Sequence, residues 1–138
     1  MKRIAAVLMA ALAALAVLVG CGGGNKLPEG MAEDELLAAG RQVLLLLTDG
    51  QFDEVQAALR ADVGATVTAE KIGSLVLEET EGMGIYKEID RSMTTGQTAA
   101  GEEIGVAVFY CVYAEGNVLY RISFDRELTL VGFSVKRQ

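Results

Sequence analysis

The apolar residues of this chain change their spacing near residue 85, and this change limits the folds that the chain can form. Before that point they recur every three or four positions, as on one side of a helix. After it they alternate with polar residues and are rich in Val, Ile, Tyr and Phe, as in strands. Helices followed by strands predict an α+β fold, with the helices packed on one face of an antiparallel sheet.

Three helices are expected, at residues 32–48, 51–61 and 68–81. Asp49 and Gly50 end the first helix, and the short connection that follows predicts a helical hairpin. Thr68 is a typical N-cap for the third helix, because its hydroxyl can accept a hydrogen bond from a free backbone N–H. Gly82 and Gly84 end that helix.

Four strands are expected, at residues 85–94, 103–113, 117–124 and 128–136. The turns between them contain Gly96, Gly101, Gly116 and Asp125, and they are short enough to predict an antiparallel meander. The second strand is apolar on both faces, so it should be central in a curved sheet.

The last strand contains a glycine at an inner position. Val131, Phe133 and Val135 alternate with polar or small residues, so Phe133 should enter the core while Gly132 points to the other face. Glycine inside a strand is typical of a bulge or a bend. We therefore interpret Gly132 as a structural residue.

The N-terminus has the pattern of a bacterial lipoprotein signal peptide. Lys2 and Arg3 precede an apolar stretch over residues 4–19, and Gly20 and Cys21 follow it. The end of this stretch resembles the lipobox, which implies cleavage before Cys21 and lipid on its thiol. The alternative, an uncleaved signal anchor, fits less well because a spanning helix usually needs about 20 apolar residues.

This pattern divides the chain into a signal peptide over residues 1–20, a lipidated cysteine with a flexible linker over residues 21–30, and one domain over residues 31–138. The protein should then be held at the extracytoplasmic side of a membrane in the cell envelope. Loss of Lys2 and Arg3 changes the formal charge from −7 to −9. Nucleic acid is therefore not an expected partner.

Scarce residue types exclude several kinds of enzyme. The chain has no histidine, so neither a Ser-His-Asp nor a Cys-His arrangement can form, and the usual zinc ligands are missing. Once Cys21 carries lipid, Cys111 has no partner for a disulfide within the chain. We interpret Cys111 as a small buried apolar side chain in a strand. Neither a metal nor another cofactor is expected.

Several segments resemble a bacterial family known as domain of unknown function 3887. The resemblance covers roughly residues 33–135 and implies a short version of the cystatin-like or nuclear-transport-factor-2-like cone, common in secreted and lipid-anchored proteins. It implies no catalytic residues. The segments that carry it are Thr68-Ala69-Glu70-Lys71-Ile72, Gly84-Ile85-Tyr86-Lys87, Phe124-Asp125 and Val131-Gly132-Phe133.

Two functions remain open for a domain of this kind. The first is a noncatalytic module that binds a small ligand or an envelope partner through the sheet, the mouth of the helices or an edge strand. The second is a cone-fold enzyme that moves protons in an apolar pocket, with a carboxylate base, tyrosine donors and an arginine for an anion. The residues that could build such a pocket are Tyr86, Asp90, Tyr110, Tyr120 and Arg121.

A structural role is the favoured interpretation of each of these residues. Tyr110 and Tyr120 are expected to be core aromatics with hydroxyls at the rim, and Arg121 is expected in a cross-strand pair at the surface. Tyr86 and Asp90 share strand parity opposite the more apolar positions of that strand, which places both on a solvent-facing side. A base that points to water is a poor one, so we expect no enzyme.

Overall fold

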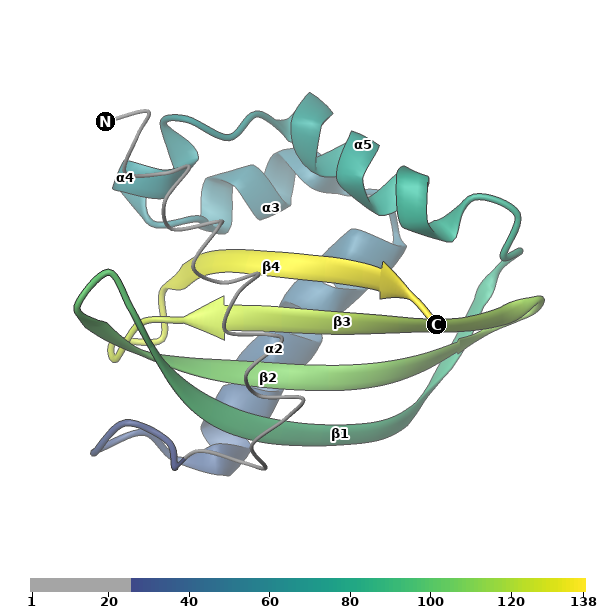
Figure 1. Cartoon of the computed structure of the whole chain (residues 1–138). Helices are drawn as coiled ribbons and strands as arrows, with labels where there is room; N and C mark the ends of the chain where they lie inside the picture. Colours follow the sequence, from purple (N-terminus) through teal and green to yellow (C-terminus); the bar gives the residue numbers. More distant parts are fainter. Residues whose placement is uncertain (1–25) are drawn as a thin grey trace.

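The computed structural model of the chain describes residues 26–138 and confirms an α+β fold with one antiparallel sheet (Figure 1). The signal peptide, the cleavage site and Cys21 lie outside the described residues. The described helices are α2 (Glu33–Thr48), α3 (Phe52–Ala58), α4 (Ala61–Gly64) and α5 (Ala69–Thr80). The described strands are β1 (Tyr86–Ala99), β2 (Glu102–Tyr113), β3 (Gly116–Phe124) and β4 (Leu130–Arg137).

The strands lie in the order β1-β2-β3-β4, so β2 and β3 are the two inner strands, as β2's apolar pattern predicts. Helix α2 crosses one face of the sheet, which we call the helix face (Figure 1). The approach is close: a Cβ at Gly40 would lie 2.6 Å from the Cβ of Ala107 and 3.0 Å from the ring of Phe109. Because Gly40 has no side chain, α2 can pack closely against β2.

Local signals set the helix ends much as the sequence predicts. The Thr68 hydroxyl accepts a hydrogen bond from the Lys71 backbone N–H at 3.2 Å and caps α5. Gly50 and Gly82 follow α2 and α5 with φ of 76° and 78°, a conformation that other residues adopt at a cost.

The second helix is shorter than predicted, and a further short helix follows it. Leu59 leaves helical geometry with ψ of 142° and forms a parallel bridge to Leu130, while the Arg60 N–H donates to the Leu130 carbonyl at 2.7 Å. Pairing with the start of β4 therefore ends the helix that the apolar spacing predicted over residues 51–61. The chain turns back into a helix only at α4.

The first strand is longer than predicted because Gly96 lies inside it. The turn comes instead at Ala100 and Gly101, whose φ of 52° and 79° suit a two-residue hairpin loop. A Cβ on Gly96 would lie 1.9 Å from the Lys26 carbonyl oxygen. This glycine permits a close approach of another segment, which a sequence cannot distinguish from a turn. The next hairpin turns at Ala114, just before Gly116.

Two register shifts in β1 overturn the predicted faces of its first half. Tyr86 pairs with Tyr113 and Ile89 with Cys111, so all four side chains point to the helix face. Each shift leaves one extra, unpaired residue in β1: Lys87 between Tyr86 and Glu88, and Asp90 between Ile89 and Arg91. Strand parity counted from the sequence therefore gave Tyr86 the wrong side.

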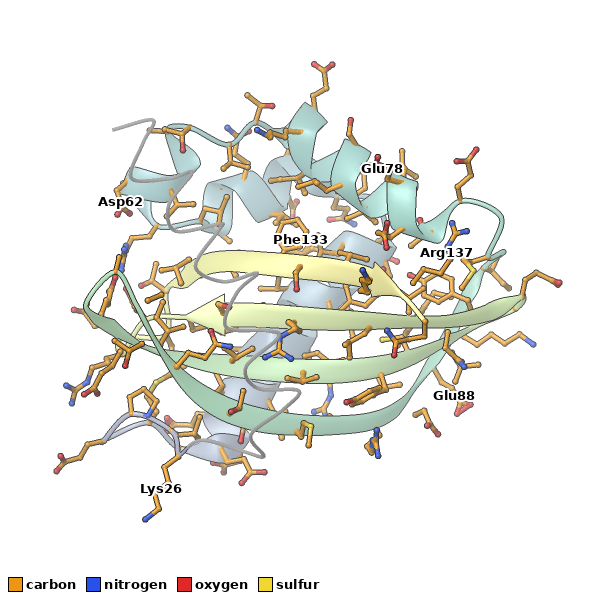
Figure 2. The ribbon with its side chains drawn as sticks, in the orientation of Figure 1. Lys26, Asp62, Glu78, Glu88, Phe133 and Arg137 are labelled. Atoms are coloured by element: carbon orange, nitrogen blue, oxygen red, sulfur yellow. The ribbon has the colours of Figure 1, made fainter. Side chains whose placement is uncertain are left out.

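The last strand follows the prediction. Gly132 pairs with Ser123, and the register shifts at Val131, the residue before it, as expected of a bulge. Phe133 pairs with Ile122 on the helix face and lies between β4 and the helices, partly buried against the core (Figure 2).

The segment before α2 is packed rather than free, which corrects the flexible spacer predicted through residue 30. Pro28 is buried, and Leu27 and Met31 pack against the core. The Met31 N–H donates to the Pro28 carbonyl at 3.1 Å, and Arg126 donates to the Glu29 carbonyl at 2.9 Å. No helix among residues 26–138 is long and apolar enough to cross a membrane.

One arginine closes the end of the fold at which the β1–β2 and β3–β4 turns lie. The Arg60 guanidinium donates to Asp62 at 2.8 Å, Glu102 at 2.6 Å and Asp125 at 3.2 Å. These hydrogen bonds raise the pKa of Arg60, and the same contact lowers the pKa of Asp62. Three separate turns are thereby joined at this end of the sheet.

Candidate functional site

The sheet separates the residues predicted for a single pocket. Tyr86 and Tyr120 point to the helix face, whereas Tyr110 and Arg121 occupy register positions on the opposite face, which we call the open face. Asp90 is exposed in its bulge. Tyr120 is a core aromatic, as expected, but its hydroxyl is buried rather than at the rim. Tyr110 is only partly buried. The five residues therefore do not line one pocket.

The end of the fold opposite Arg60 is hollowed on the helix face. A cleft of about 400 Å³ lies between the C-terminal ends of α2 and α5 and the start of β1, and we call it the helix-mouth cleft. It is lined by Leu47, Thr48, Asp49, Gly50, Phe52, Val76, Leu77, Thr80, Gly84, Ile85, Tyr86 and Tyr113.

Two large apolar side chains at this cleft face solvent. Leu77 is 61% exposed and Ile85 is 73% exposed, although both line the cleft. Ile85 follows Gly84, whose φ of 76° turns the chain from α5 into β1. Exposed apolar residues that rim a concave surface are typical of a binding site.

Three tyrosines lie behind this rim. The rings of Tyr86 and Tyr113 meet edge to face, with centroids 5.7 Å apart and planes at 73°. Behind them the hydroxyls of Tyr113 and Tyr120 form a hydrogen bond of 2.5 Å in the core. Sequence reasoning missed Tyr113. The signal was available, because Tyr113 shares strand parity with the predicted core residue Cys111.

The buried groups behind the cleft are uncharged at neutral pH. Burial raises the pKa of Tyr86, Tyr113 and Tyr120, and it raises the pKa of the Cys111 thiol to about 12. One tyrosine hydroxyl donates to the other, and the second hydroxyl keeps a proton for another acceptor. The cleft thus combines an apolar rim with the aromatic side chains of Tyr86 and Tyr113.

The arrangement of side chains in the helix-mouth cleft does not suit catalysis of proton transfer. Asp49 is the one carboxylate among the described residues that line the helix-mouth cleft, and its residue is exposed at the end of α2. A solvated carboxylate lacks the apolar environment that tunes a catalytic base. Asp90, the base considered from sequence, lies at a hollow of about 270 Å³ with Arg91 and Tyr110. No group of three or more Cys, Asp or Glu side chains in the described part of the chain is placed to hold a metal.

A more polar hollow of about 440 Å³ lies at the far end of β1, where residues 26–29 meet Gly96, Gln97 and Thr98. Its side chains include the exposed Lys26 and Glu103. The Gln97 Oε1 atom is buried and has no hydrogen-bond partner among the described residues. This hollow lacks the exposed apolar rim of the helix-mouth cleft.

The fold and the site define a small α+β domain with a cleft between its helices and its sheet. The family model described as "Protein of unknown function (DUF3887)" matches residues 41–133, and the chain belongs to that family. The match begins inside α2 and ends in β4, so it includes every described element at least in part. Among curated proteins, none matches the chain significantly.

One solved structure shares this fold. It is described as the "NMR structure of protein from Ruminococcus gnavus ATCC 29149". The two chains are 24% identical, and the match covers 80% of this chain and 96% of the other, with a TM-score of 0.69. At this identity the likeness shows the fold alone.

Proposed function

We propose that this protein is a noncatalytic binding module of the cell envelope and that the helix-mouth cleft takes a small, uncharged, mostly apolar ligand. The observation that carries the proposal is the exposure of Leu77 and Ile85 on a cleft whose floor holds Tyr86 and Tyr113. Apolar ligands are favoured because burying each Å² of apolar surface contributes about 25 cal/mol.

The charge of the site supports an uncharged ligand over an anion. Asp49 is the one charged residue among the described cleft residues, and it is acidic. An anionic ligand would meet this carboxylate and the acidic first turn of α3, where Asp53 and Glu54 lie. A cation would find no carboxylate deep in the cleft.

The second function, a cone-fold enzyme, has less support. Of its tyrosine donors only Tyr110 lies near the base Asp90, while Tyr86 and Tyr120 point to the helix face. We also propose, from the order of helices and sheet, that the fold is a short cystatin-like or nuclear-transport-factor-2-like cone. Arg60 and its carboxylates close one end of that cone, and the cleft opens at the other.

The location that we propose is the extracytoplasmic side of a membrane, through lipid on Cys21. Its support is the sequence of residues 1–21, in which basic residues, an apolar stretch and a small residue precede the cysteine. Several acyl chains on one residue hold a protein far better than one myristoyl chain. The mature domain would then encounter apolar molecules of the envelope.

A neutral fluorescent probe tests the binding function. N-phenyl-1-naphthylamine brightens in apolar sites, and we expect saturable binding to the full chain. Leu77→Ser and Ile85→Ser should each weaken binding by roughly tenfold, since each removes about 1.5 kcal/mol or more of apolar contact. Leu45→Ser is the matched control, because Leu45 is 51% exposed on α2 and is not among the residues that line the cleft.

The same titration can reject the proposal. If Leu45→Ser weakens probe binding as much as Leu77→Ser and Ile85→Ser do, the probe binds exposed apolar surface in general. If all three variants bind like the parent chain, the probe binds elsewhere, and the helix-mouth cleft is not an apolar binding site.

A further inference from the structure

Two cross-strand rows on the open face of the sheet carry a net positive charge, opposite to that of the rest of the protein. In register order, Arg91, Tyr110, Leu119 and Lys136 form one cross-strand row from β1 to β4. Met93, Val108, Arg121 and Ser134 form the next row. No described helix crosses these rows (Figure 1).

The contrast in charge is large. These two rows and the neighbouring Glu88 and Asp90 hold three cations, Arg91, Arg121 and Lys136, against two carboxylates. The other described residues hold 7 cations and 17 carboxylates. A chain with net negative charge therefore presents a basic surface on one side of its sheet, while the acidic first turns of α2 and α3 lie on the other.

The basic residues are mixed with apolar ones. The Arg91 guanidinium lies 4.1 Å from the centre of the Tyr110 ring, a cation–π contact that holds both side chains on this face. Met93 is 46% exposed, one of the most exposed large apolar residues of the described chain. The Arg121 Nη2 atom is buried and has no hydrogen-bond partner among the described residues, so Arg91 and Lys136 are the exposed cations of this face.

This patch occupies only part of the open face. Toward the β1–β2 turn, Ile104 and Val106 are buried, so the exposed part lies nearer the β2–β3 turn. Lys26 lies against Gly96 on the helix face of β1, whereas Met93 lies on the open face of the same strand. Glu88 lies at the other end of β1 (Figure 2).

We propose that this patch docks the domain on an anionic lipid surface, with the cations on lipid phosphates and Met93 and Tyr110 in the headgroup region. The proposal rests on the anchored location proposed above. Basic side chains beside an anionic membrane attract it, and tyrosine favours the interface between water and hydrocarbon. The acidic helices would then face away from the bilayer, and the chain would not tumble freely on its tether.

A fluorescence-quenching experiment tests this orientation. The full chain is reconstituted in vesicles of phosphatidylcholine with or without phosphatidylglycerol, which carry a quencher on some headgroups. A fluorophore is attached at Met93→Cys or, as the control, at Glu78→Cys, an exposed position on α5. The parent chain, labelled in parallel, gives the background from its native cysteines; buried Cys111 should not contribute.

We expect several-fold stronger quenching at position 93 than at position 78 in vesicles that contain phosphatidylglycerol. Arg91→Gln or Lys136→Gln should lower the ratio of docked to undocked protein by about fivefold, since each cation contributes about 1 kcal/mol near an anionic surface. Lys71→Gln, the same charge change on the exposed side of α5, should leave the ratio unchanged. High salt should reduce the quenching.

Equal quenching at the two positions, or stronger quenching at position 78, would overturn the docking proposal and leave the open face for a protein partner. Flotation of the protein with vesicles at high salt reports the anchor separately. If flotation is lost, the anchored location is rejected. Docking is then measured on vesicle-bound protein at low salt, where preferential quenching at position 93 would still support it.

Discussion

The two faces of the sheet use the same strands for different purposes. On the helix face, alternate residues of β2 such as Phe109 and Cys111 are covered by α2 and are almost fully buried. On the open face, the intervening Tyr110 is half-buried and carries Arg91 on its ring. The difference shows that an apolar strand can supply a core on one side and a mixed basic and apolar surface on the other.

The largest contrast in stability should therefore lie between two residues on opposite faces. Phe109→Ala should lower the free energy of unfolding by about 3–5 kcal/mol, because it leaves a cavity beneath α2. Met93→Ala should change it by less than about 0.5 kcal/mol. Denaturant unfolding of both variants measures the contrast, and comparable losses would mean that the two faces are equally packed.

The close approach of α2 to β2 predicts the next effect. Gly40→Ala should destabilise the fold by about 1–3 kcal/mol, since its Cβ would overlap that of Ala107 and neither backbone can easily move. Gly40 is in a helix, where alanine is otherwise the better residue by about 1 kcal/mol. Thermal unfolding gives the sign, and a higher midpoint for Gly40→Ala would show that the helix lies farther from the sheet.

The hydroxyl pair in the core predicts a coupled effect. Tyr113→Phe or Tyr120→Phe alone should cost about 1–2 kcal/mol, because each leaves the other buried hydroxyl without its partner. The double variant should cost less than the sum of the two, since no hydroxyl is then left unpaired. A double-mutant cycle by denaturant unfolding measures this. Strict additivity would mean that the two hydroxyls do not interact.

Stability should fall in alkaline solution, and Cys111 should contribute to the fall. Its pKa is raised by burial from 9.0 to about 12, so between these values the unfolded chain loses the thiol proton and the folded chain keeps it. The unfolded state binds fewer protons, so its formation becomes easier as pH rises above 9, by at most about 1.4 kcal/mol per pH unit from this group. Below pH 9 the contribution is fully present.

Unfolding of Cys111→Ala across this pH range isolates the thiol from the tyrosines, whose raised pKa values act in the same direction. The variant should be less stable at pH 8 but should show a shallower decline above pH 9. An unchanged slope would assign the alkaline loss to the tyrosines alone.

The sequence predicted the fold better than it predicted the site. The spacing of apolar residues and the helix-capping residues predicted α2, α5 and the four strands. These signals, such as the Thr68 cap and the inner apolar strand, are local in the sequence. The bulges at Lys87 and Asp90 depend on how β1 pairs with β2, and they moved Tyr86 to the helix face. The glycine at position 96 depends on Lys26, which is far away in sequence.

The candidate site escaped prediction for a similar reason. Leu77 has the spacing of an ordinary helix residue and Ile85 that of an ordinary strand residue, so nothing local indicates that both remain exposed. Their exposure follows from where α5 ends relative to β1. Arg91 and Tyr110 are far apart in sequence and become neighbours only through the hairpin register.

Methyl-resolved NMR titration of the full chain with the neutral naphthylamine probe tests the helix-mouth cleft most directly. We predict saturable shifts for the methyl groups of Leu77, Ile85 and Val76, with little change for Leu45 on the outside of α2 or Ile104 at the closed end of the sheet. Shifts that centre on Leu45 or Ile104, while those of Leu77 and Ile85 stay fixed, would contradict binding in this cleft.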